Sequence, residues 1–282
     1  MSLSILNNIS SLAAQNQLTM NGTSLQKTLL QLSSGSRINT GADDAAGLAI
    51  ADGLHANVTA LTQSARNASD GLGNLQVADG SLAQVTALLN RAVTIATEAS
   101  NGTVSTQQGA ALDAEFTAIK AEIDRIGSNT TYNGTQVFSG TASDVYLSDA
   151  TATGSSSIAI TVGTLSSAAI GFSAGLTAVD LSGDDLTSAA NAQTALTDIN
   201  DAIANVAADR GTLGADQNRL QSASNVISNQ VQNLTSAESS IRSADMGQTV
   251  SDMSKFSILQ QTGIAALQQS NQMQQAVLKL LQ

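Results

Sequence analysis

Apolar residues recur at intervals of seven along residues 188–242, and this spacing constrains the fold more than any other feature. One seam consists of Ile199, Val206, Leu213, Leu220, Ile227 and Leu234. A second seam is partial: Leu196, Ile203 and Val231 occupy it, and Arg210, Gln217 and Ser224 interrupt it. Sustained heptads are typical of a helix that packs lengthwise against other helices. The chain has no proline, which costs about 3 kcal/mol inside a helix, so long helices can run uninterrupted.

A second long helix is predicted from Asp44 to about Ala99. Its apolar positions follow steps of three and four: Ala51, Leu54, Val58, Leu61, Ala65, Ala68, Leu72, Leu75, Ala78, Leu82, Val85, Leu89, Ala92 and Ala96. The run of Ser and Gly at 33–36 ends the preceding helix. Gly41 is expected to give the backbone freedom in φ, and Asp43 and Asp44 to cap the next helix. Four glycines inside the helix either mark close approach of a neighbour or are merely tolerated: Gly53, Gly71, Gly73 and Gly80.

The two ends of the chain share one composition. Amphipathic helices are predicted over 1–32 and from about 248 to Leu281, and each has Ser, Asn, Gln and Thr on its polar face. No charge precedes Lys27, and the only charge after Lys255 is Lys279. Helices without charges suit crowded contacts with copies of themselves, because desolvating charges is costly. We therefore expect the ends to lie side by side, with the apolar residues of both helices in contacts: Leu3, Ile5, Ile9, Leu12, Leu25, Leu29, Leu32, Ile264, Leu267, Leu278 and Leu281.

The middle of the chain changes character. A shorter helix is predicted over 110–126, with Gly127 ending it, and strands are predicted over 131–138 around an Asn133-Gly134 turn. A small β-rich insertion follows at 140–187. It contains three short β-like runs, at 144–147, 157–162 and 176–181.

Composition argues against several functions. The net charge of −11 disfavours nucleic acid and anionic membranes as partners, and no apolar run approaches the ~20 residues of a membrane helix. The N-terminus lacks the basic region of a cleaved signal peptide. There is no cysteine, and the single histidine, His55, has no second histidine to share a zinc ion, so we expect it to be a structural or surface residue. No cofactor, metal site or catalytic group is predicted, and the chain does not read as an enzyme.

Residues 32–51, LSSGSRINTGADDAAGLAIA, resemble the N-terminal signature of bacterial flagellin almost residue for residue. Shorter matches follow in order at 67–71, 101–103, 122–126 and 132–134. Near the other end, 213–220, 258–261 and 278–281 are similar to the C-terminal signature. The resemblance covers roughly residues 1–140 and 190–282.

The resemblance implies a mainly α fold: a long antiparallel helical, coiled-coil rod with a terminal helix pair, a β-hairpin and a small β-rich central insertion. Residues 1–42 and 243–282 would form the filament-core domain, 43–139 and 188–242 the rod, and 140–187 an outward-facing variable insertion. It further implies a secreted structural subunit that polymerises with itself into the extracellular flagellar filament for swimming motility. Such a subunit leaves through the flagellar channel without a cleaved signal. Its partners would be an export chaperone, the cap and hook-junction proteins.

Two alternatives remain at this stage. A hook–filament junction protein shares terminal patterns with flagellin, and a surface adhesin would act through residues 140–187. The resemblance also places an immune-receptor patch at Leu89, Arg91 and Glu115, although Val93-Thr94-Ile95 stands where the family usually has Arg-Glu-Leu. The missing charge pair argues against strong recognition. In the alternative interpretation, Leu89 is a core residue and Arg91 is solvated or lies between subunits.

Overall fold

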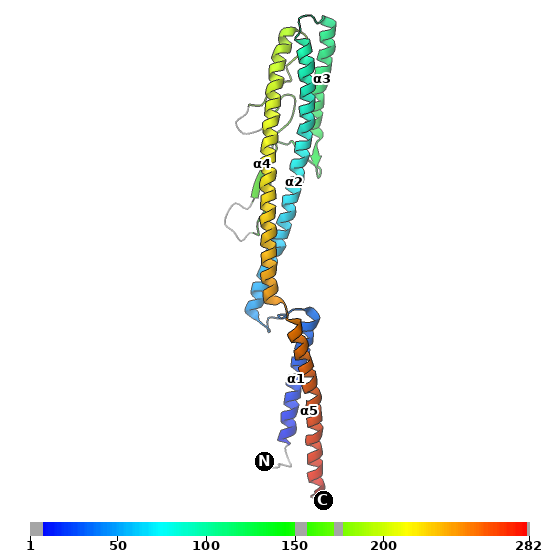
Figure 1. The fold of residues 1–282 in the computed structure, drawn as a ribbon, viewed down its shortest axis with the longest axis vertical. Coiled ribbons are helices and arrows are strands. Elements are labelled where there is room, and N and C mark those ends of the chain that lie inside the picture. The colour runs from blue at the N-terminus through cyan, green and yellow to red at the C-terminus, as the bar shows by residue number, and fades with distance from the viewer. Residues whose placement is uncertain (1–7, 150–156, 172–176, 281–282) are drawn as a thin grey trace. The chain divides into compact units, whose positions relative to one another are not determined.

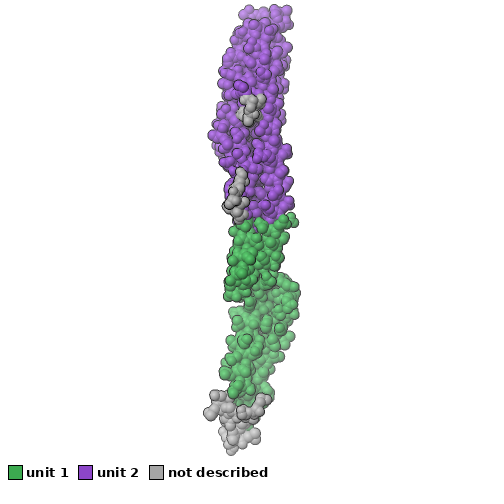
Figure 2. All heavy atoms as spheres, turned by 90° about the vertical axis from the view of Figure 1, so that its left-hand side faces the viewer, with its two compact units in different colours: residues 1–57, 232–282 green, residues 58–231 purple. Residues whose placement is uncertain are grey.

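The computed structural model describes residues 8–149, 157–171 and 177–280, and for 277–280 it describes the backbone alone. The chain divides into two compact units (Figures 1 and 2). Unit 1 contains residues 1–57 and 232–282, and unit 2 contains residues 58–231. Two long helices, α2 (Ala45–Ala99) and α4 (Ala189–Arg242), contribute residues to both. Each unit is described separately below.

Unit 1 is built on an antiparallel pair of helices, α1 (Ile9–Ser34) and α5 (Met246–Leu280), which lie side by side (Figure 1). Hydrogen bonds join the pair at both ends, from Ser270 to Asn8 and from Ala244 to the carbonyl of Gly35. The α1 helix ends at Gly35, whose left-handed φ of 69° is one that glycine adopts without strain. We expected Gly41 to supply this freedom, but its φ is not positive, and the turn is made six residues earlier.

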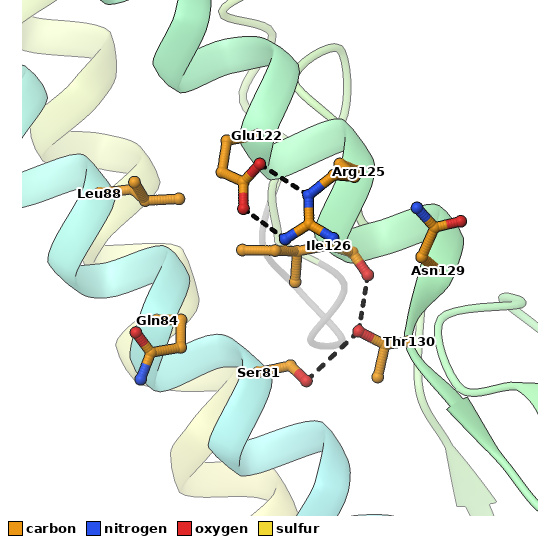
Figure 3. A pocket seen from close by; sticks show the side chains of 8 residues that line it. All are labelled: Ser81, Gln84, Leu88, Glu122, Arg125, Ile126, Asn129 and Thr130. Carbon is orange, nitrogen blue, oxygen red and sulfur yellow. Dashed lines mark hydrogen bonds and ion pairs between the residues drawn. The ribbon is translucent and has the colours of Figure 1, made fainter.

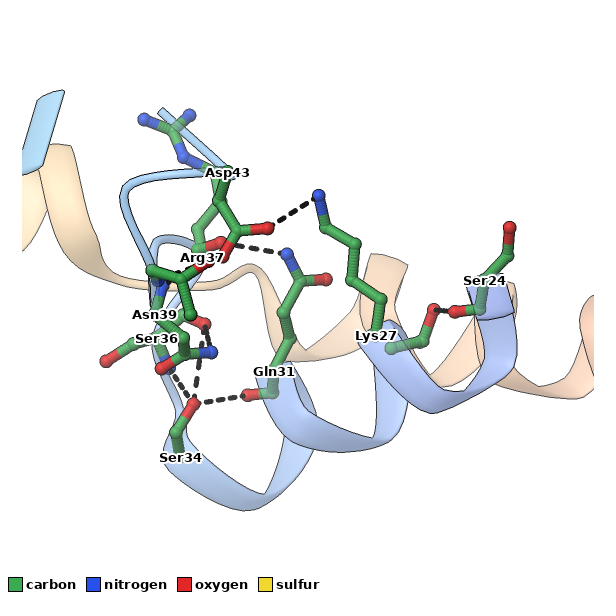
Figure 4. Close-up of polar contacts among 10 residues, drawn as sticks. Ser24, Lys27, Gln31, Ser34, Ser36, Arg37, Asn39 and Asp43 are labelled. Atoms are coloured by element: carbon green, nitrogen blue, oxygen red, sulfur yellow. Dashed lines mark hydrogen bonds and ion pairs between the residues drawn. The ribbon is translucent and has the colours of Figure 1, made fainter. Parts of the chain in front are cut away.

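The loop between α1 and α2 is organised by two neighbouring carboxylates, of which Figure 4 shows Asp43. Asp43 accepts hydrogen bonds from the backbone N–H groups of Asn39 and Thr40, at 3.2 and 3.1 Å, and pairs with Lys27 Nζ at 2.7 Å. Lys27 and these two N–H groups hold the pKa of Asp43 well below its usual range. Asp44 accepts from the N–H of Gly47 at 2.9 Å and caps α2, as predicted. The two carboxylates therefore have different roles.

Unit 2 contains three long helical segments, from α2, α3 (Thr106–Asn129) and α4, packed around one apolar core (Figure 1). The heptad seam predicted on α4 is confirmed: Ile199, Val206, Leu213, Leu220 and Ile227 are each at most 4% exposed. Arg210, which interrupts the second seam, pairs with Asp79 of α2, with 2.7 Å between Nε and Oδ1. The interruption is therefore an ion pair between two helices.

The prediction that Gly127 ends the third helix is wrong. The helix α3 continues to Asn129, and its start is fixed by a capping box between Ser105 and Gln108. Gly127 lies in the last turns, where an added Cβ would overlap the carbonyl group of Leu165. Its lack of a side chain allows close approach of another segment.

Two small antiparallel sheets complete unit 2. Strands β1 (Thr131–Tyr132) and β2 (Thr135–Gln136) form the predicted hairpin, and both of its turn residues, Asn133 and Gly134, have positive φ. Strands β3 (Ala142–Tyr146) and β4 (Ser157–Thr161) pair in the register Ala142↔Thr161. The third predicted run forms no strand in its described part. Val179 makes one bridge to Ile170, and Leu176 lies outside the described residues.

The described parts of the segment 140–187 pack into the core formed by α2, α3 and α4. Its buried apolar side chains belong to the same cluster as those of α2, α3 and α4: Val145, Ile160, Val162, Leu165, Ile170, Leu181 and Leu186. Two helix carboxylates fasten it. Asp124 accepts from the N–H and Oγ of Ser167 at 2.6 and 2.9 Å, and Asp113 accepts from the N–H of Leu186 at 2.8 Å.

Four glycines of α2, at positions 53, 71, 73 and 80, divide evenly between the two interpretations left open by the sequence. An added Cβ on Gly71 would come within 2.8 Å of Val145 Cγ2, and one on Gly73 within 2.7 Å of the Tyr132 hydroxyl. At Gly53 and Gly80 it would meet nothing within 4 Å. Close approach therefore explains Gly71 and Gly73, and the other two are tolerated.

Candidate assembly surface

Exposed large apolar side chains concentrate in unit 1. Among the described residues, all of them lie in this unit except Tyr146 and Val226: Ile9, Leu12, Met20, Leu29, Leu30, Ile50, Met246, Val250, Ile258, Leu259, Ile264 and Met273. The buried apolar side chains show the opposite distribution, since Ile38 and Ala51 are the only ones described in unit 1. Such a large set of exposed apolar side chains is unusual for a free soluble domain and marks an interaction surface.

The interface between α1 and α5 is partly polar. The buried residues at this interface include Asn21, Thr28, Thr249 and Ser270, each at most 9% exposed. Ser270 Oγ reaches Asn8 Oδ1 at 3.2 Å across the pair. Gly263 of α5 faces Leu18, because a Cβ added there would lie 3.3 Å from Leu18 Cδ1. The helices approach closely through small and polar residues, while many of their large apolar side chains point outward.

The structure divides the predicted contact residues into two sets. Leu25, Leu32 and Leu267 are half-buried, and they occupy heptad positions with the buried polar residues. Ile9, Leu12, Leu29 and Ile264 are exposed, with Ile9 71% exposed. Leu3, Ile5 and Leu281 lie outside the described residues, as does the side chain of Leu278.

Some exposed apolar residues were missed by the sequence analysis, namely Met20, Leu30, Ile258, Leu259 and Met273. The prediction assigned the contact residues to one face of each terminal helix, and these residues do not lie on that face. The signal that could have found them is the doubled apolar step at Leu29-Leu30 and at Ile258-Leu259. Two adjacent apolar residues on a helix cannot face the same neighbour.

The outward surface of the pair has few charges. In the described parts of α1 and α5 the charged side chains are Lys27, Asp252 and Lys255, and Lys27 is paired with Asp43. Burying such a surface would require little charge desolvation. Within the described residues, no helix has the length and hydropathy needed to cross a membrane. No group of three or more acidic or imidazole side chains in the same residues is placed to hold a metal ion.

Comparisons with known proteins assign the chain to a family. The family description "Bacterial flagellin N-terminal helical region" matches residues 5–143, and "Bacterial flagellin C-terminal helical region" matches residues 196–281. The flagellin of Halalkalibacterium halodurans is 36% identical over 98% of this chain and 99% of its own length. The chain belongs to the bacterial flagellin family. Flagellins are structural subunits of the extracellular flagellar filament, and membership makes this chain a structural filament subunit.

Other relatives support the same assignment. The flagellin of Bacillus subtilis is 34% identical over 98% of this chain and 99% of its own. A solved structure described as a flagellar hook-associated protein, from Vibrio parahaemolyticus, has a TM-score of 0.57 and 15% identity. It covers 71% of this chain and all of that one, and at this identity the likeness shows the fold alone.

The residues that resemble the immune-receptor patch of flagellins lie on two helices of unit 2. Leu89 of α2 is fully buried in the core. Arg91 of α2 pairs with Glu115 of α3, with 2.7 Å between Nε and Oε1, and both side chains are exposed. This hydrogen bond lowers the pKa of Glu115 and raises that of Arg91. Arg91 and Glu115 thus form one ion pair on the surface, whereas Leu89 is part of the core.

A shallow groove of about 340 Å³ lies between α2 and α3, near the C-terminal end of α3 (Figure 3). Leu88 and Ile126 give it apolar walls. Arg125 and Glu122 pair across one turn of α3, with 2.7 Å between Nε and Oε2, which lowers the pKa of Glu122. Ser81 and Thr130 hydroxyls approach to 3.4 Å across the groove. The charges in this groove are satisfied by each other.

His55 lies on α2 in unit 1 and is exposed. Its Nδ1 is 3.2 Å from Glu238 Oε1 of α4, so it contributes to the polar contact between these two helices. The structure places it among surface ion pairs, together with Arg242, which lies 3.5 Å from Asp52.

Proposed function

We propose that this flagellin polymerises by burying the exposed apolar side chains of α1 and α5 against neighbouring copies of the chain. The observation that supports this most strongly is the reversed distribution in unit 1: polar residues lie buried between the helices and large apolar residues lie outside. Burying one Leu or Ile side chain contributes about 1.5–3 kcal/mol. The eleven exposed large apolar side chains described on α1 and α5 would together contribute about 16–33 kcal/mol if fully buried.

The domain assignment is part of this proposal. Residues 1–42 and 243–282 would form the filament core, 43–139 and 188–242 the surrounding rod, and 140–187 would face outward. Rotation of the filament would then produce thrust for swimming. Export would use the flagellar channel without a cleaved signal, and an export chaperone, a cap and hook-junction proteins would be partners. The basis for these partners is the family alone.

The second candidate is a hook–filament junction protein, because such proteins share terminal sequence patterns with flagellin. The two roles differ in copy number, because a filament subunit assembles without limit and a junction protein forms a short ring. The other alternative, a surface adhesin, would need a binding face on residues 140–187.

The test is seeded polymerisation of the purified chain in ammonium sulfate, which strengthens apolar burial, followed by electron microscopy. We expect long uniform filaments from the unmodified chain. Leu29→Asp should prevent polymerisation, because a charge would have to be buried at a subunit contact. Leu29→Met keeps an apolar side chain of similar size at the same position and should polymerise normally.

Truncation tests the same proposal more broadly. Chains lacking residues 1–30 or 255–282 should stay monomeric and keep the helical content of unit 2. Normal filaments from either truncation, or from Leu29→Asp, would refute the proposed surface. Short caps in place of filaments from the unmodified chain would favour the junction protein.

A further inference from the structure

A second groove in unit 2 is chemically different from the apolar surface described above. It holds about 340 Å³ and lies between α2, the β1–β2 hairpin and the β3–β4 sheet. Its floor consists of Gly71, Val145 and Ile160, all of them buried. Gly71 allows Val145 to pack directly against the backbone of α2, since an added Cβ would approach Val145 Cγ2 to 2.8 Å.

The rim of the groove is polar on each side. The helix α2 contributes Asn67, Asp70 and Asn74, and the hairpin and strand β3 contribute Asn133 and Asp144 among others. Asn67 Nδ2 donates to the carbonyl of Tyr146 at 3.1 Å and holds the end of β3 against the helix. The rim therefore belongs to three elements fixed to one another, and the groove is preformed.

Asn74 has an unsatisfied polar atom in this groove. Its Oδ1 is buried and accepts no hydrogen bond from the described residues. Buried acceptors in folded proteins almost always have a partner, and an exception calls for an explanation. Because this oxygen is closed to solvent, a ligand hydroxyl reaches it only after the half-buried Asn74 side chain rotates toward the groove.

Aromatic side chains also gather at the groove. The chain has two tyrosines, and both Tyr132 and Tyr146 line it. Tyr146 is 43% exposed, and among the described residues it is the one aromatic side chain in the exposed class. An aromatic residue presents a flat apolar body with a polar tip.

We propose that this groove binds a neutral oligosaccharide. Pyranose rings present flat C–H faces that pack on aromatic and apolar surfaces, and their hydroxyls pair with the donors and acceptors of amides and carboxylates. The lining contains no Lys or Arg and two carboxylates, which disfavours phosphate, sulfate and acidic sugars. The volume lies within the ordinary range for small-ligand sites. This inference does not depend on the proposed mode of assembly.

The experiment is saturation-transfer NMR on the full-length monomeric chain, with maltotriose and N,N′,N″-triacetylchitotriose as probes. We expect transfer to at least one of the two, and about a tenfold loss of affinity in Tyr146→Ala and in Asn74→Ala. Asn90→Ala, at an exposed position on the same helix away from the groove, is the matched control and should bind as the unmodified chain does. Circular dichroism verifies that each variant keeps its helices.

Three results would overturn the proposal. The first is no transfer to either sugar at about 5 mM, a typical limit for weak ligands, and the second is equal transfer in all variants. The third is that trilysine displaces the bound sugar at a lower concentration than added unlabelled sugar does. The last result would assign the groove to a cationic ligand. Seeded polymerisation of the same variants is measured in parallel. A failure to bind sugar with normal polymerisation refutes the groove alone.

Discussion

Substituting alanine at two helical glycines of unit 2 should have opposite effects on stability. Gly80 has no atom within 4 Å of an added Cβ, so Gly80→Ala should raise the free energy of unfolding by about 1 kcal/mol through helix propensity. Gly127→Ala receives the same gain. However, its Cβ would overlap the carbonyl of Leu165, a backbone group that can yield only if the segment around it moves away from α3.

The cost at Gly127 follows from what that movement would break. The hydrogen bonds from Ser167 to Asp124 lie one turn away from Gly127, and a hydrogen bond to a charged group contributes about 1.5–3 kcal/mol. Overpacking costs a further 1–3 kcal/mol or so. If one of these hydrogen bonds is lost, subtracting the propensity gain of about 1 kcal/mol leaves a net destabilisation of about 1.5–5 kcal/mol.

Calorimetry on the full chain measures both effects. For a unit of this size, about 1 kcal/mol shifts the midpoint of thermal unfolding by roughly 2–4 °C. Gly80→Ala should therefore raise the midpoint by a few degrees, and Gly127→Ala should lower it by roughly 3–20 °C. If Gly127→Ala were as stable as Gly80→Ala, the close contact between α3 and Leu165 would be refuted.

Two further predictions concern polar contacts. Because Lys27 and two N–H groups lower the pKa of Asp43, its stabilising contribution is complete above the unfolded pKa of about 3.9 and is lost as pH falls toward the lower folded value. Carboxyl NMR should show Asp43 still ionised at about pH 3, and a titration near about 3.9 would contradict the lowered pKa. Asp43→Asn should speed amide hydrogen exchange at Thr40. In unit 2, Asn205 is 6% exposed, and its Nδ2 donates to the Ile170 and Thr177 carbonyls at 3.2 and 2.9 Å. Asn205→Ala should cost about 2 kcal/mol in urea unfolding, and a change below about 0.5 kcal/mol would mean that these bonds contribute nothing net.

The helices of unit 2 were predictable because their apolar residues face one core within the same chain. The seam from Ile199 to Ile227 has a strict seven-residue spacing, and the structure buries all of it. Periodicity reports a helix face directly when that face packs in the same chain. Gly127 shows the limit of local signals. A glycine near a helix end reads as a terminator, and only the distant residue Leu165 explains it.

The candidate assembly surface was only partly predictable for a related reason. In α1, Leu25 and Leu32 lie in the seam with α5, while Ile9, Leu12 and Leu29 lie outside it. Two apolar faces on one helix add up to a blurred pattern in the sequence.

The packing of residues 140–187 changes how an adhesin could be tested. Deleting the segment would remove the proposed adhesin face, and a filament subunit without it would still be expected to polymerise. However, Val145, Ile160 and Leu181 are part of the rod core, so the deletion would also expose apolar surface on α2, α3 and α4. Point substitutions at exposed positions such as Tyr146 separate binding from folding, and a deletion does not.

The contrast between the two units bears on where the stability of the subunit comes from. In unit 2 the apolar side chains are buried within the chain, so we expect this unit to fold in the monomer. In unit 1 the buried contacts between α1 and α5 include Asn21, Thr28, Thr249 and Ser270, whose hydrogen bonds replace bonds to water and contribute little net stability. Polar residues in a helical seam can nevertheless fix which helix pairs with which, and in what register. We therefore expect the seam to determine the pairing of α1 with α5, while burial of the outward apolar residues against other copies supplies most of the energy that keeps the pair ordered.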